Sequence, residues 1–230
     1  MINIFLSITI AAVISYFLGS CNSSIIIVKL LKNEDIRNFG SHNAGLTNTL
    51  RCFGKKCAVI TLIGDLSKGI IAVTLSRLFC YLLNGGLLPD NDTHYIGYIA
   101  GFFAIIGHIF PAYYGFKGGK GVLVGVSAFL AVDPVMFALL MAIFIIVLSA
   151  SKYVSLASIT ASVCCPLITF FLHFFAYDDP LRYSVLYTVL AFIMSYTVIF
   201  MHRSNIQRLK NGTENKFSFK SKKLRVEEEK

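Results

Sequence analysis

Three clusters of polar residues interrupt an otherwise apolar chain, and the second cluster points most clearly to a chemistry. It reads GHIFPAYYGFKGGKG from Gly107 to Gly121 and stands directly before an apolar segment. Glycines leave backbone N–H groups open to a ligand, and a helix N-terminus adds positive potential, so this composition is typical of a phosphate site. It is not a Walker loop, because no Ser or Thr follows Lys120. The candidate substrate-binding residues are His108, Lys117, Gly118, Gly119, Lys120 and Gly121.

The first cluster, GSHNAGLTN from Gly40 to Asn48, is followed by Arg51. It is dense in small hydroxyl and amide residues. A turn-rich connector that caps the next helix would use some of them. The cluster offers more donors and acceptors than one cap needs, and the residues alone leave both interpretations open. The candidates for a functional role are Ser41, Asn43, Thr47, Asn48 and Arg51.

The third cluster runs from His202 to Glu214, after the last apolar segment. His202 and Asn205 are three residues apart, which places them on one face of a helix. Taken alone, the cluster is explained by a capped helix end whose cations reach toward water. Within the second apolar segment, Asp65 and Lys68 have the same spacing, and charges inside a membrane segment are usually paired. We therefore expect an ion pair there.

One further pattern is discounted. His173 and Asp178 match the His-x4-Asp spacing of a known acyltransferase class. Two fixed residues are weak evidence, and the pair stands at the end of the sixth apolar segment that is opposite to the three clusters. The six cysteines lie mostly in apolar runs, with no histidine at zinc-ligand spacing, so we expect neither a metal nor a cofactor.

The elements that position these clusters are apolar segments. Of the 230 residues, 56% are hydrophobic and 14% charged, and the mean hydropathy is +0.69. These values exclude an ordinary soluble domain and predict an all-α, polytopic integral membrane protein. Asp133-Pro134 divides the longest stretch into two short helices or a re-entrant pair. About seven transmembrane helices are expected: Ile2–Val28, Cys57–Leu83, Tyr95–Phe116, Val122–Val132, Val135–Ala150, Tyr153–Tyr177 and Tyr183–Met201.

The basic residues predict the orientation. Lys and Arg number 21 against 12 Asp and Glu, a net charge of +9, and they gather between the first two segments, around Lys117–Lys120 and in the C-terminal tail. The positive-inside rule then places the N-terminus outside and the C-terminus in the cytoplasm, with all three clusters on the cytoplasmic side. The charge thus indicates membrane topology and phosphate binding, with no nucleic-acid partner. We expect one membrane domain, residues 1–216, and a tail, residues 217–230, that contacts membrane lipids.

At the three clusters the chain resembles the acyl-phosphate-dependent glycerol-3-phosphate acyltransferases of bacterial membranes, the PlsY family. GSHNAGLTN with Arg51, the Gly64-Asp65 and Lys68-Gly69 pairs, GHIFPAYYGFKGGKG and His202–Ile206 carry the resemblance. It implies transfer of a fatty acyl group from acyl phosphate to the 1-position of glycerol 3-phosphate. The products would be lysophosphatidic acid and phosphate, in the cell inner membrane, with a functional link to an enzyme that produces acyl phosphate. The catalytic residues it implies are Ser41, Arg51, Lys120, His202 and Asn205.

The chain departs from the family pattern at His42, where glycine is common, and at Leu46, where alanine is usual. Our hypothesis gives the acyl-phosphate group to Lys120 and the Gly118–Gly121 amides, and the glycerol phosphate to Arg51. His202 and Asn205 would orient the reacting groups, a substrate phosphate oxygen would take the proton, and Ser41 need not be a nucleophile. A phosphate transporter is the main rival, and it predicts polar residues along a path across the membrane.

Overall fold

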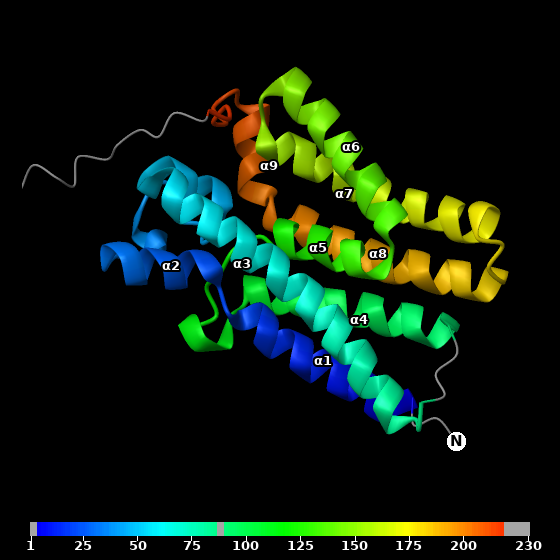
Figure 1. Cartoon of the computed structure of the whole chain (residues 1–230). Coiled ribbons are helices and arrows are strands. Elements are labelled where there is room, and N and C mark those ends of the chain that lie inside the picture. The colour runs from blue at the N-terminus through cyan, green and yellow to red at the C-terminus, as the bar shows by residue number, and fades with distance from the viewer. Residues whose placement is uncertain (1–3, 87–89, 219–230) are drawn as a thin grey trace, which may run out of the picture.

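The computed structural model describes residues 4–86 and 90–218, and its regular elements within these ranges are all helical (Figure 1). Most of the expected tail, residues 219–230, lies outside the described residues. A π turn, Leu172–Ala176, extends α7. The α-helices are α1 Ile4–Ser20, α2 Ser23–Lys32, α3 Leu46–Leu83, α4 Asp90–Ile109, α5 Val122–Val132, α6 Pro134–Ser151, α7 Val154–Phe171, α8 Leu181–Met201 and α9 Arg203–Lys210.

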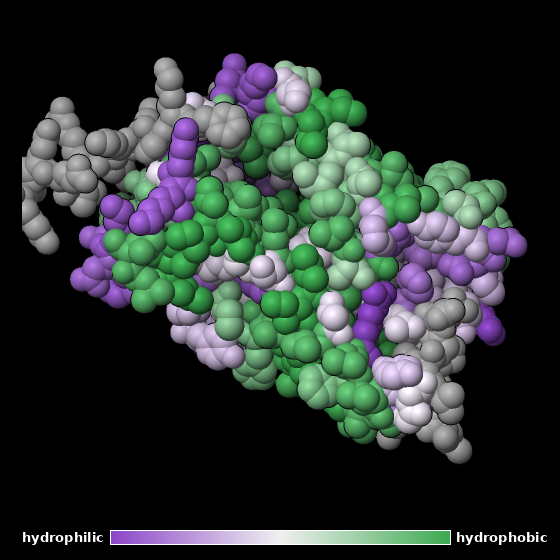
Figure 2. Space-filling view, viewed as in Figure 1, coloured by the Kyte–Doolittle hydropathy of each residue, from purple (hydrophilic) through white to green (hydrophobic). Residues whose placement is uncertain are grey.

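The described part of the chain has six helical stretches long and apolar enough to cross a membrane, and the shorter α5 is a seventh apolar helix. Many large apolar side chains on these helices are exposed, as expected for helices that face the hydrocarbon core of a membrane. Figure 2 shows apolar side chains across the middle of the molecule and hydrophilic ones gathered toward its ends. The predicted polytopic, all-α membrane fold is confirmed.

The predicted break at Asp133-Pro134 is also confirmed. Asp133 caps α6 by accepting hydrogen bonds from the backbone N–H groups of Val135 and Met136, and Pro134 occupies the first turn. The 11 residues of α5 span only about 16 Å at about 1.5 Å per residue. The Asp133-Pro134 break nevertheless lies level with the far end of α7, because the Tyr177 hydroxyl donates to Asp133 at 3.1 Å. Helices α5 and α6 therefore run in opposite directions across the bundle.

Two of the predicted segments have different bounds in the structure. The first segment is two helices, because α1 ends at Ser20 and Asn22 caps α2 by accepting from the Ile25 N–H. The second segment, predicted from Cys57, agrees with the part of α3 that follows a break at Gly54, but α3 itself begins at Leu46. The φ of Gly54 is 80°, in the left-handed region that favours glycine. The end of the first polar cluster is therefore helical, and the first two turns of α3 carry Thr47, Asn48 and Arg51.

The discounted His-x4-Asp motif, His173 and Asp178, lies at the bundle end formed by the α5–α6 break and the α7–α8 turn. His173 is 1% exposed; its Nδ1 lies 2.7 Å from a carboxylate oxygen of Asp179, the neighbour of the expected Asp178. The Tyr98 hydroxyl lies 3.2 Å from Nε2. These contacts tie α4 to the turn between α7 and α8, which is a structural role.

Candidate active site

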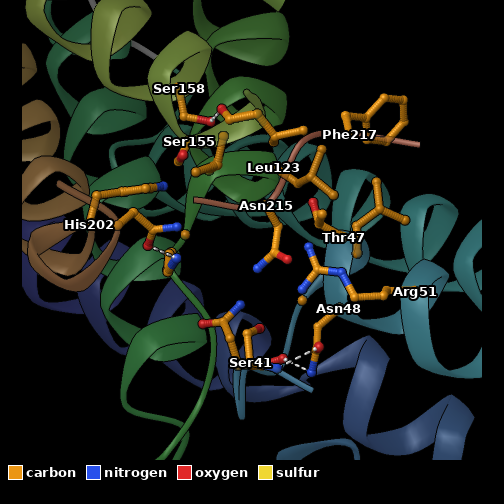
Figure 3. A pocket seen from close by; sticks show the side chains of 18 of the residues that line it. Ser41, Thr47, Asn48, Arg51, Leu123, Ser155, Ser158, His202, Asn215 and Phe217 are labelled. Atoms are coloured by element: carbon orange, nitrogen blue, oxygen red, sulfur yellow. Dashed lines mark hydrogen bonds between the residues drawn. The ribbon is translucent and has the colours of Figure 1, made fainter. Parts of the chain in front are cut away.

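A pocket opens where the N-terminal turns of α3, α5 and α7 meet α9 (Figure 3). In Figure 3, Arg51 and Asn215 point into its centre from one side and His202 lies across from them. The pocket brings together residues of all three sequence clusters, which are up to about 160 positions apart in the chain. The sequence-predicted residues that line it are Ser41, Asn43, Thr47, Asn48, Arg51, His108, Lys120, Gly121, His202 and Asn205.

Two helix N-termini form part of the pocket wall. Gly45 precedes α3 and Gly121 precedes α5, and neither makes a side-chain cap. Both glycines and the first residues of the two helices line the pocket. Uncapped N-terminal N–H groups and the helix dipole attract anions. Gly121 has φ +80°, and a Cβ there would lie 2.7 Å from Ile105, so this turn requires glycine.

Lys120 is held by a hydrogen-bond network that begins at its ammonium group. The Lys120 Nζ donates to the Asn205 Oδ1. The Asn205 Nδ2 donates to Glu214 at 2.8 Å, as does the Ser155 hydroxyl at 3.0 Å. Arg208 donates to the other Glu214 oxygen at 2.6 Å. The network therefore fixes the amide of Asn205 with its oxygen toward Lys120.

Sequence reasoning missed Glu214, whose side chain is 8% exposed, and its neighbours Asn215 and Phe217, which line the pocket. The only sequence signal was an isolated acid in a basic segment. Burial opposes ionisation of Glu214, but the hydrogen bonds from Asn205, Arg208 and Ser155 keep its pKa below the ordinary value. An ionised Glu214 neutralises Arg208.

The charges in the pocket leave a positive surplus. Asp65 pairs with Lys68 and Glu214 with Arg208, so Arg51 and Lys120 remain as the pocket cations without an ion pair among the described residues. Burial first, and the nearby Arg208 next, lower the pKa of Lys120 from 10.5 to about 8. The Lys120 ammonium therefore lacks a full counter-charge until an anion enters.

His202 is neutral in this environment. Its Nδ1 lies 2.8 Å from the Val198 carbonyl oxygen, which can only accept, so the imidazole proton sits on Nδ1 and Nε2 keeps its lone pair. Burial, and then the nearby Lys120, lower the pKa of His202 to about 4. His202 thus offers the pocket a hydrogen-bond acceptor.

Asn48 lines the pocket, but its amide is occupied within the protein. The Oδ1 accepts from the Ser41 backbone N–H at 3.0 Å, and the Nδ2 donates to the carbonyls of Phe39 and Asn43 at 2.9 and 3.1 Å. The side chain is 2% exposed. Asn48 therefore shapes the loop that presents Ser41, a role different from the predicted substrate contact.

His42 replaces the glycine common in the family pattern at a position that explains the preference. Its φ is +57°, in the left-handed region, which costs a residue with a Cβ more than glycine. The His42 ring nitrogen Nδ1 lies 2.9 Å from the Arg37 carbonyl oxygen. This contact helps the loop keep its shape with histidine in place of glycine.

Three predicted residues are not among those that line the pocket: Lys117, Gly118 and Gly119. The Gly118 and Gly119 N–H groups donate to the carbonyls of Ile109 and His108, both at 3.0 Å. The hypothesis that these amides hold phosphate is wrong for this structure. A Cβ at Gly118 would lie 2.0 Å from the His108 carbonyl oxygen, so close packing accounts for the glycine. Lys117 is exposed, and its carbonyl accepts from Arg37.

The expected ion pair between Asp65 and Lys68 is present at 2.9 Å and buried. The Lys68 Nζ also lies 2.8 Å from the His108 Nδ1 and donates to the Cys21 carbonyl at 3.1 Å. Asp65 and His108 both line the pocket. Since an ammonium group donates, His108 accepts at Nδ1, and its proton is on Nε2.

The fold and the site define a polytopic, all-helical membrane protein with a basic pocket at one end of its bundle. The family model described as glycerol-3-phosphate acyltransferase matches residues 9–212. The chain belongs to the glycerol-3-phosphate acyltransferase family, and it is an acyltransferase.

Relatives and solved structures agree with this assignment. A glycerol-3-phosphate acyltransferase of Clostridioides difficile is 39% identical, over 92% of this chain and 96% of the relative. One from Fusobacterium nucleatum is 41% identical, over 90% and 96%. The crystal structure of PlsY (YgiH), an integral membrane glycerol 3-phosphate acyltransferase in its glycerol 3-phosphate form, superposes with a TM-score of 0.75 at 33% identity, covering 92% of this chain and 96% of that one. Its lysophosphatidic acid form gives a TM-score of 0.72 at 31% identity.

Proposed function

We propose that this protein transfers a fatty acyl group from acyl phosphate to the 1-position hydroxyl of glycerol 3-phosphate. The hydroxyl oxygen attacks the acyl carbon, the bond from that carbon to the phosphate oxygen breaks, and the hydroxyl proton passes to a phosphate oxygen. The products are lysophosphatidic acid and inorganic phosphate. The observation that carries the proposal is one pocket with two cations, Arg51 and Lys120, that have no ion-pair partner among the described residues.

Each cation takes one phosphate in this proposal. Lys120 and the N-terminal amides of α5 hold the acyl-phosphate group, and they stabilise the charge that grows on the leaving phosphate. Arg51 and the N-terminal turn of α3 hold glycerol 3-phosphate, and the guanidinium binds its phosphate bidentately. The arrangement brings the hydroxyl beside the carbonyl, and this alignment supplies much of the rate.

His202, Asn205 and Ser41 orient the reacting groups. The Nε2 lone pair of His202 accepts a hydrogen bond from the glycerol hydroxyl. The low pKa of His202 makes it too weak a base to keep the hydroxyl proton. Asn205 keeps Lys120 in place. The Ser41 hydroxyl contacts substrate and forms no acyl-enzyme. Isolation of an acylated Ser41, or full turnover by Ser41→Ala, would overturn this assignment of roles.

The pocket faces the cytoplasm in this proposal, with the N-terminus of the chain outside and the C-terminus inside. Exposed lysines surround the pocket end of the bundle, among them Lys29, Lys32, Lys55 and Lys56, as the positive-inside rule requires of the cytoplasmic side. The protein would sit in the bacterial inner membrane as one domain, residues 1–216, with residues 217–230 as a lipid-contacting tail. A separate enzyme that makes acyl phosphate would supply its donor.

The direct test uses the purified protein in detergent or liposomes with octanoyl, lauroyl or palmitoyl phosphate and glycerol 3-phosphate. Lysophosphatidic acid and inorganic phosphate should appear in equal amounts, and omission of either substrate should abolish the lipid product. Palmitoyl-CoA in place of palmitoyl phosphate should give no product. Product formed from the thioester alone would refute the proposed donor.

The pH dependence of the reaction should follow Lys120. Its pKa is about 8, so the ammonium charge is present below pH 8 and is lost as the pH rises through that value. We expect kcat/KM to fall about tenfold for each pH unit above about 8. A bound phosphate favours the charged form, so the alkaline limb of kcat should lie at higher pH than that of kcat/KM. A kcat/KM that stays level up to pH 10 would contradict this prediction.

The same substitution at two histidines distinguishes a structural role from a catalytic one. His173→Gln removes a buried imidazole from the far end of the bundle, where each lost hydrogen bond costs about 1 kcal/mol or more. We expect a lower unfolding temperature with kcat/KM within about threefold of the wild type. The same substitution at His202 should lower kcat about tenfold or more and change the unfolding temperature less. Loss of activity in folded His173→Gln would return the discounted motif to consideration.

A further inference from the structure

A second, mostly apolar cavity lies next to the pocket, toward the middle of the bundle. Val122, Phe144 and Ser158 line both spaces, so the two adjoin at these side chains. Apolar side chains of α4, α5, α6, α7 and α8 form most of the wall of this second cavity. It leads away from the cations, as an apolar branch of the site.

Helix direction gives the depth of this cavity. Helices α5 and α7 run away from the pocket, and Phe129 and Cys165 are the farthest residues along them that line the cavity. Helices α6 and α8 run toward the pocket, and there Leu140 and Met194 are the farthest. All four are buried. Phe129 lies seven residues beyond Val122, so the cavity is about 10 Å deep at about 1.5 Å per residue.

The deep end of the cavity is held in place by aromatic packing. The Tyr98 ring meets the Phe129 ring edge-on at 5.9 Å, and Tyr98 is stacked on Tyr187 at 5.5 Å. Tyr98 is itself fixed by its hydroxyl contact with His173. The Phe129 ring therefore has little room to move aside when a ligand reaches it.

We infer that this cavity takes the acyl chain of the donor and that Phe129, with Leu140 and Met194, ends it and sets the preferred acyl length. This inference rests on the proposed function, since that reaction places an acyl carbonyl next to Lys120 and requires its chain to leave the polar pocket. The shared residues Val122, Phe144 and Ser158 are the passage. Each methylene that enters the cavity gains packing contacts with its apolar wall, and a methylene that meets Phe129 gains none.

The test compares kcat/KM over a series of even-numbered saturated acyl phosphates from octanoyl to stearoyl, with glycerol 3-phosphate fixed. In Phe129→Ala the optimum should move to longer chains by at least one step of the series, while the shortest donors stay within about threefold of the wild type. The matched control is Phe192→Ala, the same change on the outer face of α8, where the ring is 58% exposed. Its length profile should equal that of the wild type.

A second variant protects the test against misfolding of the first. Ser162 lines the cavity and is half-buried, so Ser162→Leu should narrow the cavity and move the optimum toward shorter chains. Unchanged profiles in both variants, or the same shift in Phe192→Ala, would overturn the inference and leave the proposed reaction standing. A wild-type protein that accepts no donor of the series would instead overturn the proposed function.

Discussion

Lys120→Ala is expected to lower kcat/KM for acyl transfer by about 10²–10³-fold, which is the usual loss when one preorganised charge-stabilising donor is removed. The size of the effect follows from the surroundings of the ammonium group. It is mostly buried beside two uncapped helix N-termini, and its single described hydrogen-bond partner, Asn205, is neutral. A substrate phosphate therefore supplies the negative charge that Lys120 lacks among its protein contacts. Because the donor's phosphate is also the leaving group, KM should rise and kcat should fall.

Lys117 provides a matched control three residues away. It has the same side chain in the same glycine-rich segment, but it is exposed and is not among the residues that line the pocket. Lys117→Ala should keep kcat/KM within about twofold, and both variants should unfold at similar temperatures. Equal losses in the two variants would mean that the segment acts by its overall charge, and the assignment of Lys120 would be wrong.

The convergence of the three polar clusters could be predicted from the sequence because it depends on membrane topology. Basic residues mark one side of the membrane. Each polar cluster borders an apolar segment at the end that lies on that side. Asp133-Pro134 predicted a helix break in the same way, because proline removes a backbone donor wherever it stands. Such features follow from local chemistry, and the fold confirms them.

The hydrogen-bond partners within the clusters could not be predicted, because they depend on which backbone groups the folded loops bring together. Gly118 and Gly119 read as phosphate ligands, yet their N–H groups bond to Ile109 and His108. Asn48 read as a substrate ligand, yet it clamps its own loop. Glu214, the last residue of the third cluster, was given no role, yet it orders the partner of Lys120. Composition indicated an anion site, and only the packing shows which groups remain open to the anion.

Arg51 should determine the affinity for glycerol 3-phosphate. It stands in the second turn of α3, lines the pocket, and has no hydrogen bond or ion pair among the contacts described for residues 4–86 and 90–218. Arg51→Ala is expected to raise the KM for glycerol 3-phosphate by about 10²-fold, because a bidentate charged pair contributes about 3 kcal/mol. Arg51→Lys keeps the charge without the planar fork, and it should fall between the wild type and the alanine variant.

The alanine variant also has an independent signature in the pH profile. Arg51 is one of the positive charges that lower the pKa of Lys120. Its removal should raise that pKa, so the alkaline limb of the residual kcat/KM should move above pH 8. The control, Arg203→Ala, removes an exposed guanidinium that lies over the Phe200 ring at 4.9 Å. It should change neither the KM for glycerol 3-phosphate nor the alkaline limb of kcat/KM. If Arg51→Ala raised the KM for acyl phosphate and left that for glycerol 3-phosphate unchanged, the two cations would exchange roles, with Arg51 on the leaving phosphate and Lys120 on the acceptor.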